Sequence, residues 1–119
     1  MTAFISHTTV DCRNAYELSL FWSAVLGFAE DPDDPNEPGD EECMISAPDG
    51  QQRLLFIEVP EAKAVKNRLH LDVRVGEQDR DDVVTRLVDR GATVLHTGQQ
   101  GPFSWVTMTD PEGNEFCVA

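Results

Sequence analysis

The segment from Asn67 to Val75 reads NRLHLDVRV, and it constrains the fold more than any other stretch of the chain. Apolar and polar residues alternate through it, which predicts a β-strand with one apolar face and one polar face. The polar face carries His70 and Asp72. A histidine in the middle of such a strand is unusual, and it makes His70 a candidate functional residue.

The features around this strand occur twice in the chain. His70 follows His7 by 63 residues, and the Pro-acid-Gly turn at Pro111 follows the turn at Pro48 by the same interval. Agreement between a strand histidine and a turn at one spacing indicates a duplicated unit. The sequence therefore predicts two modules of about sixty residues, each with the order strand, helix, strand, strand, strand (βαβββ).

One helix is expected in each module. The first covers about residues 14–26, where apolar residues recur at the spacing of one helix face and Asn14 with Glu17 resembles a capping box. The second opens at Asp79 and closes at Gly91, a residue type that favours helix ends. Its apolar face is expected to comprise Val84, Leu87 and Val88.

The remaining strands are short. The acidic segment Glu30–Glu42 contains three prolines, which exclude a regular helix or a central strand, so it is expected to be a loop. A calcium-binding loop is disfavoured there because the glycine expected at the sixth position is missing. Strands are expected over residues 4–11, near Phe28, and over Cys43–Ser46, Arg53–Val59, 92–95, Ser104–Thr109 and Glu115–Ala119.

The fold class that these elements predict is α+β. The two βαβββ modules in tandem would form a curved mixed sheet with the helices on its outer side. All 119 residues would make one domain, with module 1 over about 1–60, a connector over 60–67 and module 2 over about 68–119.

Composition excludes several classes of function. The net charge of -13 repels phosphates, which disfavours DNA or RNA binding. No apolar run is long enough to cross a membrane, and the start of the chain lacks a signal-peptide pattern. Three cysteines without close pairing argue against a disulfide framework or a zinc knuckle. We therefore expect a cytoplasmic protein whose partners are small molecules, with neutral or cationic ligands favoured by the acidic charge.

The repeat also predicts which side chains share the sheet face that the helices leave uncovered. Imidazole and carboxylate groups on adjacent strands suit a divalent metal with open coordination positions, which acts as a Lewis acid. The alternative is that these side chains are ordinary pocket or solvated residues. The uncovered face is expected to carry His7, Thr9, Leu54, Phe56, Glu58, His70, Asp72, Glu115 and Cys117.

Three stretches of sequence resemble one known superfamily across nearly the whole chain. They are HTTVD from His7, FWSAVLGF from Phe21, and DPEGNEFC from Asp110. The second strand histidine, His70, belongs to the same resemblance. These motifs are similar to those of the vicinal oxygen chelate superfamily, which includes glyoxalase I, bleomycin-resistance proteins and extradiol dioxygenases. The similarity is greatest to the small glyoxalase-like domain proteins. It implies paired βαβββ modules, a homodimer and a ligand site in the curved sheet.

The resemblance also implies a set of site residues. His7 and His70 match two metal ligands of the metal-dependent members, and Cys117 stands where the family's last glutamate ligand is usual. Glu58 and Glu115 are candidates for a further ligand or for the catalytic carboxylate that moves a proton. A thiolate ligand would favour zinc, with nickel next and manganese, iron or magnesium less favoured. The expected ligand pocket comprises Phe56, Asp72, Phe103 and Trp105, although both Phe103 and Trp105 are equally compatible with the core.

Two functions of different classes remain open from the sequence. The first is a metal-dependent lyase or isomerase of the glyoxalase type, in which a metal polarises a substrate carbonyl and a carboxylate carries the proton. The second is a metal-free binding protein of the drug-sequestering kind that holds a cationic ligand between aromatic walls. The departures at Cys117 favour the second, whereas the paired histidines favour the first.

Overall fold

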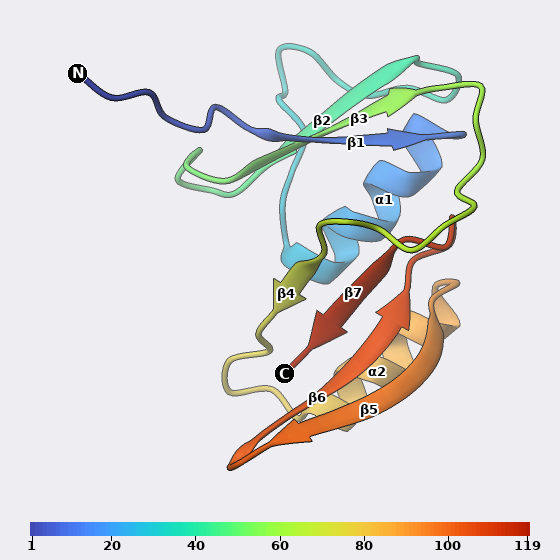
Figure 1. Cartoon of the computed structure of the whole chain (residues 1–119). Helices are drawn as coiled ribbons and strands as arrows, with labels where there is room; N and C mark the ends of the chain where they lie inside the picture. Colours follow the sequence, from blue (N-terminus) through green and yellow to red (C-terminus); the bar gives the residue numbers. More distant parts are fainter. The chain divides into compact units, whose positions relative to one another are not determined.

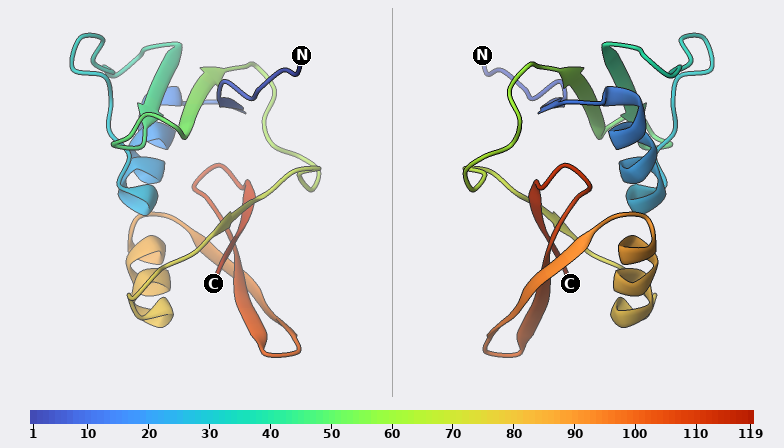
Figure 2. Two further views of the ribbon diagram at one scale, coloured as in Figure 1. Left: turned by 90° about the vertical axis from the view of Figure 1, so that its left-hand side faces the viewer. Right: turned by 90° about the vertical axis from the view of Figure 1, so that its right-hand side faces the viewer.

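The computed structural model describes residues 1–119, and the chain divides into two compact units, Met1–Ala62 and Lys63–Ala119 (Figure 1). Each unit has its own sheet, with one helix covering one face of that sheet (Figure 2). The fold class is α+β, as expected, but the strands form two separate mixed sheets instead of one. Neither helix is long and apolar enough to cross a membrane.

The first unit contains β1 (Thr8–Cys12), α1 (Ala15–Leu26), β2 (Glu42–Ser46) and β3 (Arg53–Glu58). The strand order is β1-β3-β2, with β1 parallel and β2 antiparallel to β3. The extra strand expected near Phe28 is reduced to a single bridge between Ala29 and Ser46. The first strand begins at Thr8, which is later than the sequence predicts.

The two ends of α1 follow from their capping residues. The Asn14 side-chain oxygen accepts a hydrogen bond from the Glu17 N–H at 3.0 Å, which satisfies one of the unpaired donors of the first turn. Gly27 adopts the left-handed conformation with φ of 70°, and its N–H donates to the Ser23 carbonyl at 2.8 Å. The expected helix boundaries are therefore confirmed.

The predicted face of β3 is wrong. Phe56 is fully buried and pairs with Cys43, whose thiol lies within hydrogen-bonding reach of Ser19 on α1, so both side chains face the helix. Val10 of β1 pairs with Phe56, and Val73 of β4 pairs with Val118. Val10 and Val73 are 63 residues apart, whereas their partners Phe56 and Val118 are 62 residues apart. A shift of one residue exchanges the two faces of a strand.

Two site predictions change with that face. Phe56 belongs to the core of the first unit and does not line a pocket. Glu58 has the same parity as Phe56 and pairs with the buried Cys12, so it lies on the helix side of its strand and not on the face of His7.

The second unit contains β4 (Leu71–Val73), α2 (Arg80–Asp89), β5 (Thr93–Gln100), β6 (Phe103–Thr109) and β7 (Glu115–Val118). The strand order is β4-β7-β6-β5, with β4 parallel to β7 and the other pairs antiparallel. The strand that the sequence places over 67–75 is shorter in the structure, but the hairpin strands β5 and β6 are longer than expected.

The buried face of α2 differs by one residue from the prediction. Val83 and Leu87 are buried, whereas Val88 is 45% exposed and Val84 is half-buried. Val83 and Leu87 are four residues apart, which places them on one helix face. The prediction of Val84 and Val88 as core residues is therefore wrong, and only Leu87 of the three is buried.

The core of the second unit lies between its sheet and the side of α2 that carries Val83 and Leu87. The side chains of Val106 and Met108 on β6 and of Phe116 and Val118 on β7 are buried in it, and the residues between them point to the opposite face. This arrangement confirms the prediction that Glu115 and Cys117 lie on the sheet face that the helix leaves uncovered. The buried strand residues are Val73, Val106, Met108, Phe116 and Val118.

Candidate functional site

The face of the second sheet that α2 does not cover is hollowed into a pocket of about 510 Å³. The pocket is formed within the second unit by side chains that alternate with the core residues of its strands. The central lining residues are His70, Asp72, Trp105, Thr107, Glu115 and Cys117.

The strand register places four polar side chains in one row across this pocket. Asp72 of β4 pairs with Cys117 of β7, and Cys117 pairs with Thr107 of β6. Thr107 in turn pairs with His96 of β5. Because paired residues of neighbouring strands share a sheet face, all four side chains point to the pocket side. We call these four residues the polar row.

His70, Asp72 and Cys117 form a compact cluster at one end of the polar row. One ligand atom from each residue lies within 4.8 Å of the other two. His70 Nε2 is 3.5 Å from Asp72 Oδ1, and Cys117 Sγ is 3.5 Å from Thr107 Oγ1. The cluster therefore places an imidazole, a carboxylate and a thiol at the wall of the pocket.

The donor set of this cluster fits a divalent transition metal. In a tetrahedral zinc site with metal–ligand distances of about 2.0–2.3 Å, the ligand atoms lie roughly 3.3–3.8 Å apart. The ligand atoms lie within 4.8 Å of one another, and rotation of the exposed His70 and Asp72 side chains can bring them to these distances. Three protein ligands leave a fourth position for a ligand in the pocket, and the soft thiolate favours zinc over magnesium.

Glu115 also lines the pocket, but its carboxylate is already occupied. Its Oε1 accepts from Lys63 Nζ at 2.9 Å, and its Oε2 accepts from the Asn67 N–H at 3.0 Å. The Asn67 side chain donates to the Glu115 carbonyl at 2.9 Å and accepts from its N–H at 3.3 Å. Glu115 therefore fastens the segment before β4 onto β7.

These contacts set the protonation state of Glu115. Burial acts to raise the pKa of the carboxyl, but the hydrogen bonds from Asn67 and Lys63 and the Lys63 charge outweigh it and lower the pKa to about 2. A group that carries protons near neutral pH needs a pKa near that pH. The catalytic role that the sequence suggests for Glu115 therefore has no support in its surroundings.

An aromatic wall adjoins the cluster. Trp105 pairs with Gly98 across the β5–β6 hairpin, and a Cβ atom placed on Gly98 would lie 2.3 Å from the indole ring. The ring thus lies across the backbone of Gly98, and any larger residue there would have to displace it. Phe103, two residues along the same strand, is 65% exposed and also lines the pocket. Phe103 and Trp105 are thus pocket residues in this structure and not core.

The residues expected from the first module lie in the first unit. His7 is half-buried, and its Nδ1 is 3.0 Å from Ser6 Oγ. Arg53 of β3 donates to the Ser6 carbonyl at 3.0 Å, which ties the segment before β1 to the sheet. The His7 ring is therefore in hydrogen-bonding contact with Ser6, and its role as a metal ligand stays a prediction.

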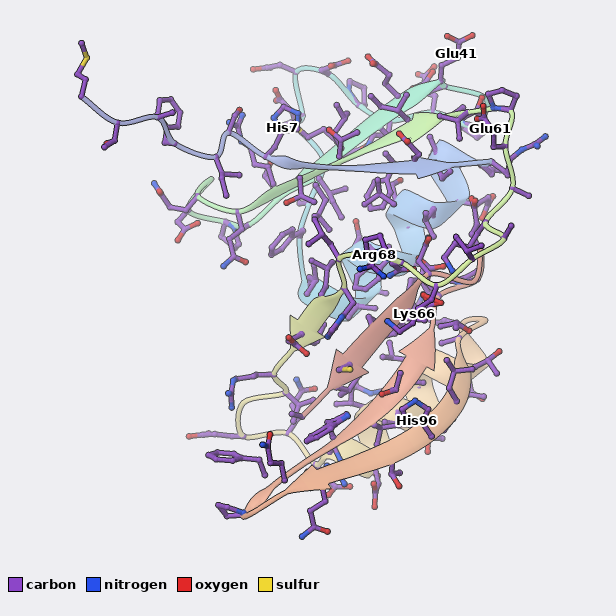
Figure 3. All side chains as sticks on the ribbon, in the orientation of Figure 1. His7, Glu41, Glu61, Lys66, Arg68 and His96 are labelled. Atoms are coloured by element: carbon purple, nitrogen blue, oxygen red, sulfur yellow. The ribbon has the colours of Figure 1, made fainter.

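Several pocket residues were not predicted from the sequence, among them Lys66, Arg74, His96 and Thr107. Figure 3 shows Lys66 on the segment that leads into β4, and His96 on β5. For Lys66 and Arg74 a signal existed, because they continue the period-two pattern of His70 and Asp72 in both directions. His96 had no such signal, since its placement depends on a register shift between Val94 and His96.

The family model of the glyoxalase-like domain matches residues 7–119 of the chain. No curated protein matches the chain. The match spans both units and includes every candidate site residue named above.

Solved structures share the fold. A mutant of the fosfomycin resistance protein FosX from Listeria monocytogenes, complexed with Mn(II) and 1S,2S-dihydroxypropylphosphonic acid, has a TM-score of 0.76 and 13% identity, covering 99% of this chain and 90% of that chain. A glyoxalase/bleomycin resistance protein/dioxygenase family enzyme from Burkholderia phytofirmans has a TM-score of 0.76 and 20% identity, covering 98% and 97%. The oxidase ChaP-H2 has a TM-score of 0.69 and 19% identity, covering 99% and 93%.

Proposed function

Because the chain belongs to the glyoxalase-like domain family of the vicinal oxygen chelate superfamily, we propose that it binds a small molecule in the second-unit pocket beside a divalent metal held by His70, Asp72 and Cys117. The observation that carries this proposal is the placement of three metal-ligating side chains in the wall of a 510 Å³ pocket. Ligand pockets in proteins commonly enclose about 300–1,000 Å³. The Mn(II) in the FosX structure supports a metal in this fold.

Each residue of the cluster has a defined part in the proposed site. His70 and Asp72 supply the nitrogen and oxygen ligands from the β4 edge, and Cys117 supplies sulfur from β7. Thr107 contacts the Cys117 sulfur and orients it, as outer groups do for metal ligands. A metal held there supplies Lewis acidity toward a ligand oxygen, which a lyase or isomerase reaction uses. Glu115, tied to Lys63, takes no part in proton transfer in this proposal.

Metal analysis of protein purified without an affinity tag tests the proposal. We expect about one equivalent of zinc or another divalent transition metal per chain, and its loss in the His70→Ala and Cys117→Ser variants. The matched control is His96→Ala, because His96 lines the same pocket but stands outside the cluster. Metal content that falls equally in His70→Ala and His96→Ala would contradict the assignment of the ligands.

Two expectations from the sequence are tested by the same preparations. A His7→Ala variant decides whether His7 also contributes a ligand. Light scattering decides whether the protein is a homodimer. Both stay predictions, as does a cytoplasmic location.

A metal-free binding protein is the second candidate function. The exposed ring of Phe103 and the Trp105 ring packed on Gly98 form an aromatic wall that a ligand can contact without any metal. Absence of stoichiometric metal from the tag-free protein, together with unchanged ligand binding after chelator treatment, would favour this function over the first.

A further inference from the structure

The negative charge of the protein is concentrated in the first unit. Residues 1–62 contain 13 Asp and Glu but only two Arg, which gives a formal charge of -11. Residues 63–119 contain nine Asp and Glu and seven Lys and Arg, which gives -2. The pocket therefore lies in the unit that holds most of the cations, and the total charge of -13 does not describe its surroundings.

Two of those cations line the pocket without a partner. Lys66 and Arg74 make no hydrogen bond or ion pair, whereas Lys63 is paired with Glu115 at 2.9 Å. With that pair neutral, Asp72 is the remaining carboxylate among the side chains of the lining, and it belongs to the metal cluster. The side chains of the lining thus carry more positive than negative charge, which favours an anion over the cationic ligand that composition suggests.

The strand register places Arg74 in the same row as Trp105. The Ala119 N–H donates to the Val73 carbonyl at 2.9 Å, and the Ala119 carbonyl accepts from Val75 at 3.0 Å, so Ala119 lies beside Arg74. Val118 pairs with Val106, which places Trp105 on the other side of Ala119. Two strand spacings separate Arg74 from Trp105, or roughly 10 Å between their backbones.

The residues between and beneath these two side chains are small. Ala119 lies between Arg74 and Trp105, and Gly98 lies under the indole ring. This row is two residues along β7 from Cys117, about 6–7 Å from the metal cluster. The pocket thus presents a guanidinium at one side, a flat aromatic surface at the other, and the cluster next to both.

We propose that the pocket selects a small organic anion, whose carboxylate or similar group pairs with Arg74 and whose planar apolar part lies on Trp105. Lys66, on the segment before β4, also lines the pocket and adds to the attraction for the negative charge. The inference rests on the pocket of the proposed function but not on its metal. Arg74 is then the residue that sets specificity, because a guanidinium binds a carboxylate through two parallel hydrogen bonds.

Three probes of one size and shape test the inference, namely benzoate, benzamide and benzylamine. They are titrated into the full chain at neutral pH, and the two tryptophan indole N–H signals are followed by ¹H–¹⁵N NMR. Trp22 is only 3% exposed, so the Trp105 signal, identified from a Trp105→Phe variant, is the one expected to move. We expect benzoate to bind at least tenfold more tightly than benzamide, with benzylamine weaker still.

Matched variants separate Arg74 from the general charge. Arg74→Gln is expected to weaken benzoate binding by roughly tenfold, the effect of one charge-assisted contact. Arg90→Gln makes the same change of charge in the same unit, on an exposed residue that does not line the pocket, and is expected to leave the affinity unchanged. Arg74→Lys is expected to restore part of the affinity.

Several outcomes would overturn the inference. They are equal affinity for benzoate and benzamide, equal losses in Arg74→Gln and Arg90→Gln, or no movement of the Trp105 signal with any probe. The titration is repeated after chelator treatment and in the His70→Ala variant. Benzoate binding that needs the metal but survives Arg74→Gln would show that this inference is wrong while the proposed function stands.

Discussion

At the scale of single residues, Glu115 shows how one side chain fixes the edge of the pocket. The carboxylate accepts hydrogen bonds from Lys63 and from the Asn67 backbone, and the Asn67 side chain pairs with the Glu115 backbone. These contacts hold the segment that carries Lys66 against β7. A carboxylate that accepts several hydrogen bonds is stabilised in its charged form, so its contribution to stability depends on pH.

We expect Glu115→Gln to lower the free energy of unfolding by about 2 kcal/mol at pH 7, the usual loss for hydrogen bonds to a charged group. The pKa of this carboxyl is about 2 in the folded protein against an ordinary 4.5, so the unfolded chain takes up the proton first as the pH falls. The stabilisation is therefore fully present above about pH 5 and is lost between there and pH 2.

Urea unfolding of both proteins from pH 7 to pH 2.5 measures this difference. The control is Glu77→Gln, which removes an exposed carboxylate that makes no hydrogen bond or ion pair in the same unit. A difference between wild type and Glu115→Gln that stays constant across this range would contradict the assigned role of Glu115.

Gly98 is a second residue whose identity the structure requires. A Cβ atom at this position would lie 2.3–2.5 Å from the Trp105 ring, so Gly98→Ala must displace the indole. We expect a loss of roughly 1–3 kcal/mol, as for other overpacked sites, and a change in tryptophan fluorescence.

A double-mutant cycle with Trp105→Ala measures whether the cost of Gly98→Ala comes from the indole. In the Trp105→Ala background we expect Gly98→Ala to cost little. An equal cost in both backgrounds would mean that the glycine is needed for its backbone and not for the ring.

At the scale of elements, α2 depends on its first turn. The Asp79 carboxylate accepts from the Asp82 N–H at 3.1 Å and also lies at the positive end of the helix dipole. We expect Asp79→Ala to destabilise the protein by about 1 kcal/mol in thermal or urea unfolding. Asp89→Ala is the control, because a carboxylate in the last turn opposes the dipole and its removal is expected to be neutral or slightly stabilising. Equal losses of stability in Asp79→Ala and Asp89→Ala would contradict the capping role of Asp79.

The elements were predictable from the sequence where the local signals were strong. The cap at Asn14 and the two Pro-acid-Gly turns correctly predicted the start of the first helix and the positions of the hairpin turns. The face of β3 was not predictable, since a repeat interval that changes by one residue leaves no mark in the sequence and yet reverses the face of Phe56.

The site was predictable to a similar degree. Alternation correctly placed His70, Asp72 and Cys117 on one face, but the sequence could not show that their ligand atoms come within 4.8 Å, because that depends on the pairing of β4 with β7. The contact of Glu115 with Lys63 joins residues 52 positions apart and had no sequence signal. His96 was not predicted as a pocket residue, because its pairing with Thr107 depends on the register of β5 and β6.

At the scale of the whole molecule, metal binding and stability are linked. A ligand that binds only the folded state stabilises it by about 2.7 kcal/mol at a hundredfold excess over its Kd. We therefore expect added zinc to raise the free energy of unfolding of the wild type by about this amount, and a chelator to reverse it. The His70→Ala variant is expected to show no zinc effect, and His96→Ala to respond as the wild type does. A zinc effect that persists in His70→Ala would place the ion elsewhere.

The central claim is that Cys117 and His70 hold a metal in the wall of the second-unit pocket. Replacing the metal with cobalt(II) tests it most directly, because a thiolate bound to cobalt gives a charge-transfer absorption in the near ultraviolet. We predict one equivalent of cobalt with that absorption in the wild type, the loss of the absorption in Cys117→Ser, and its retention in Cys43→Ser and Cys12→Ser, whose thiols are buried in the first unit. Cobalt binding without the thiolate absorption, or an absorption unchanged in Cys117→Ser, would contradict the claim.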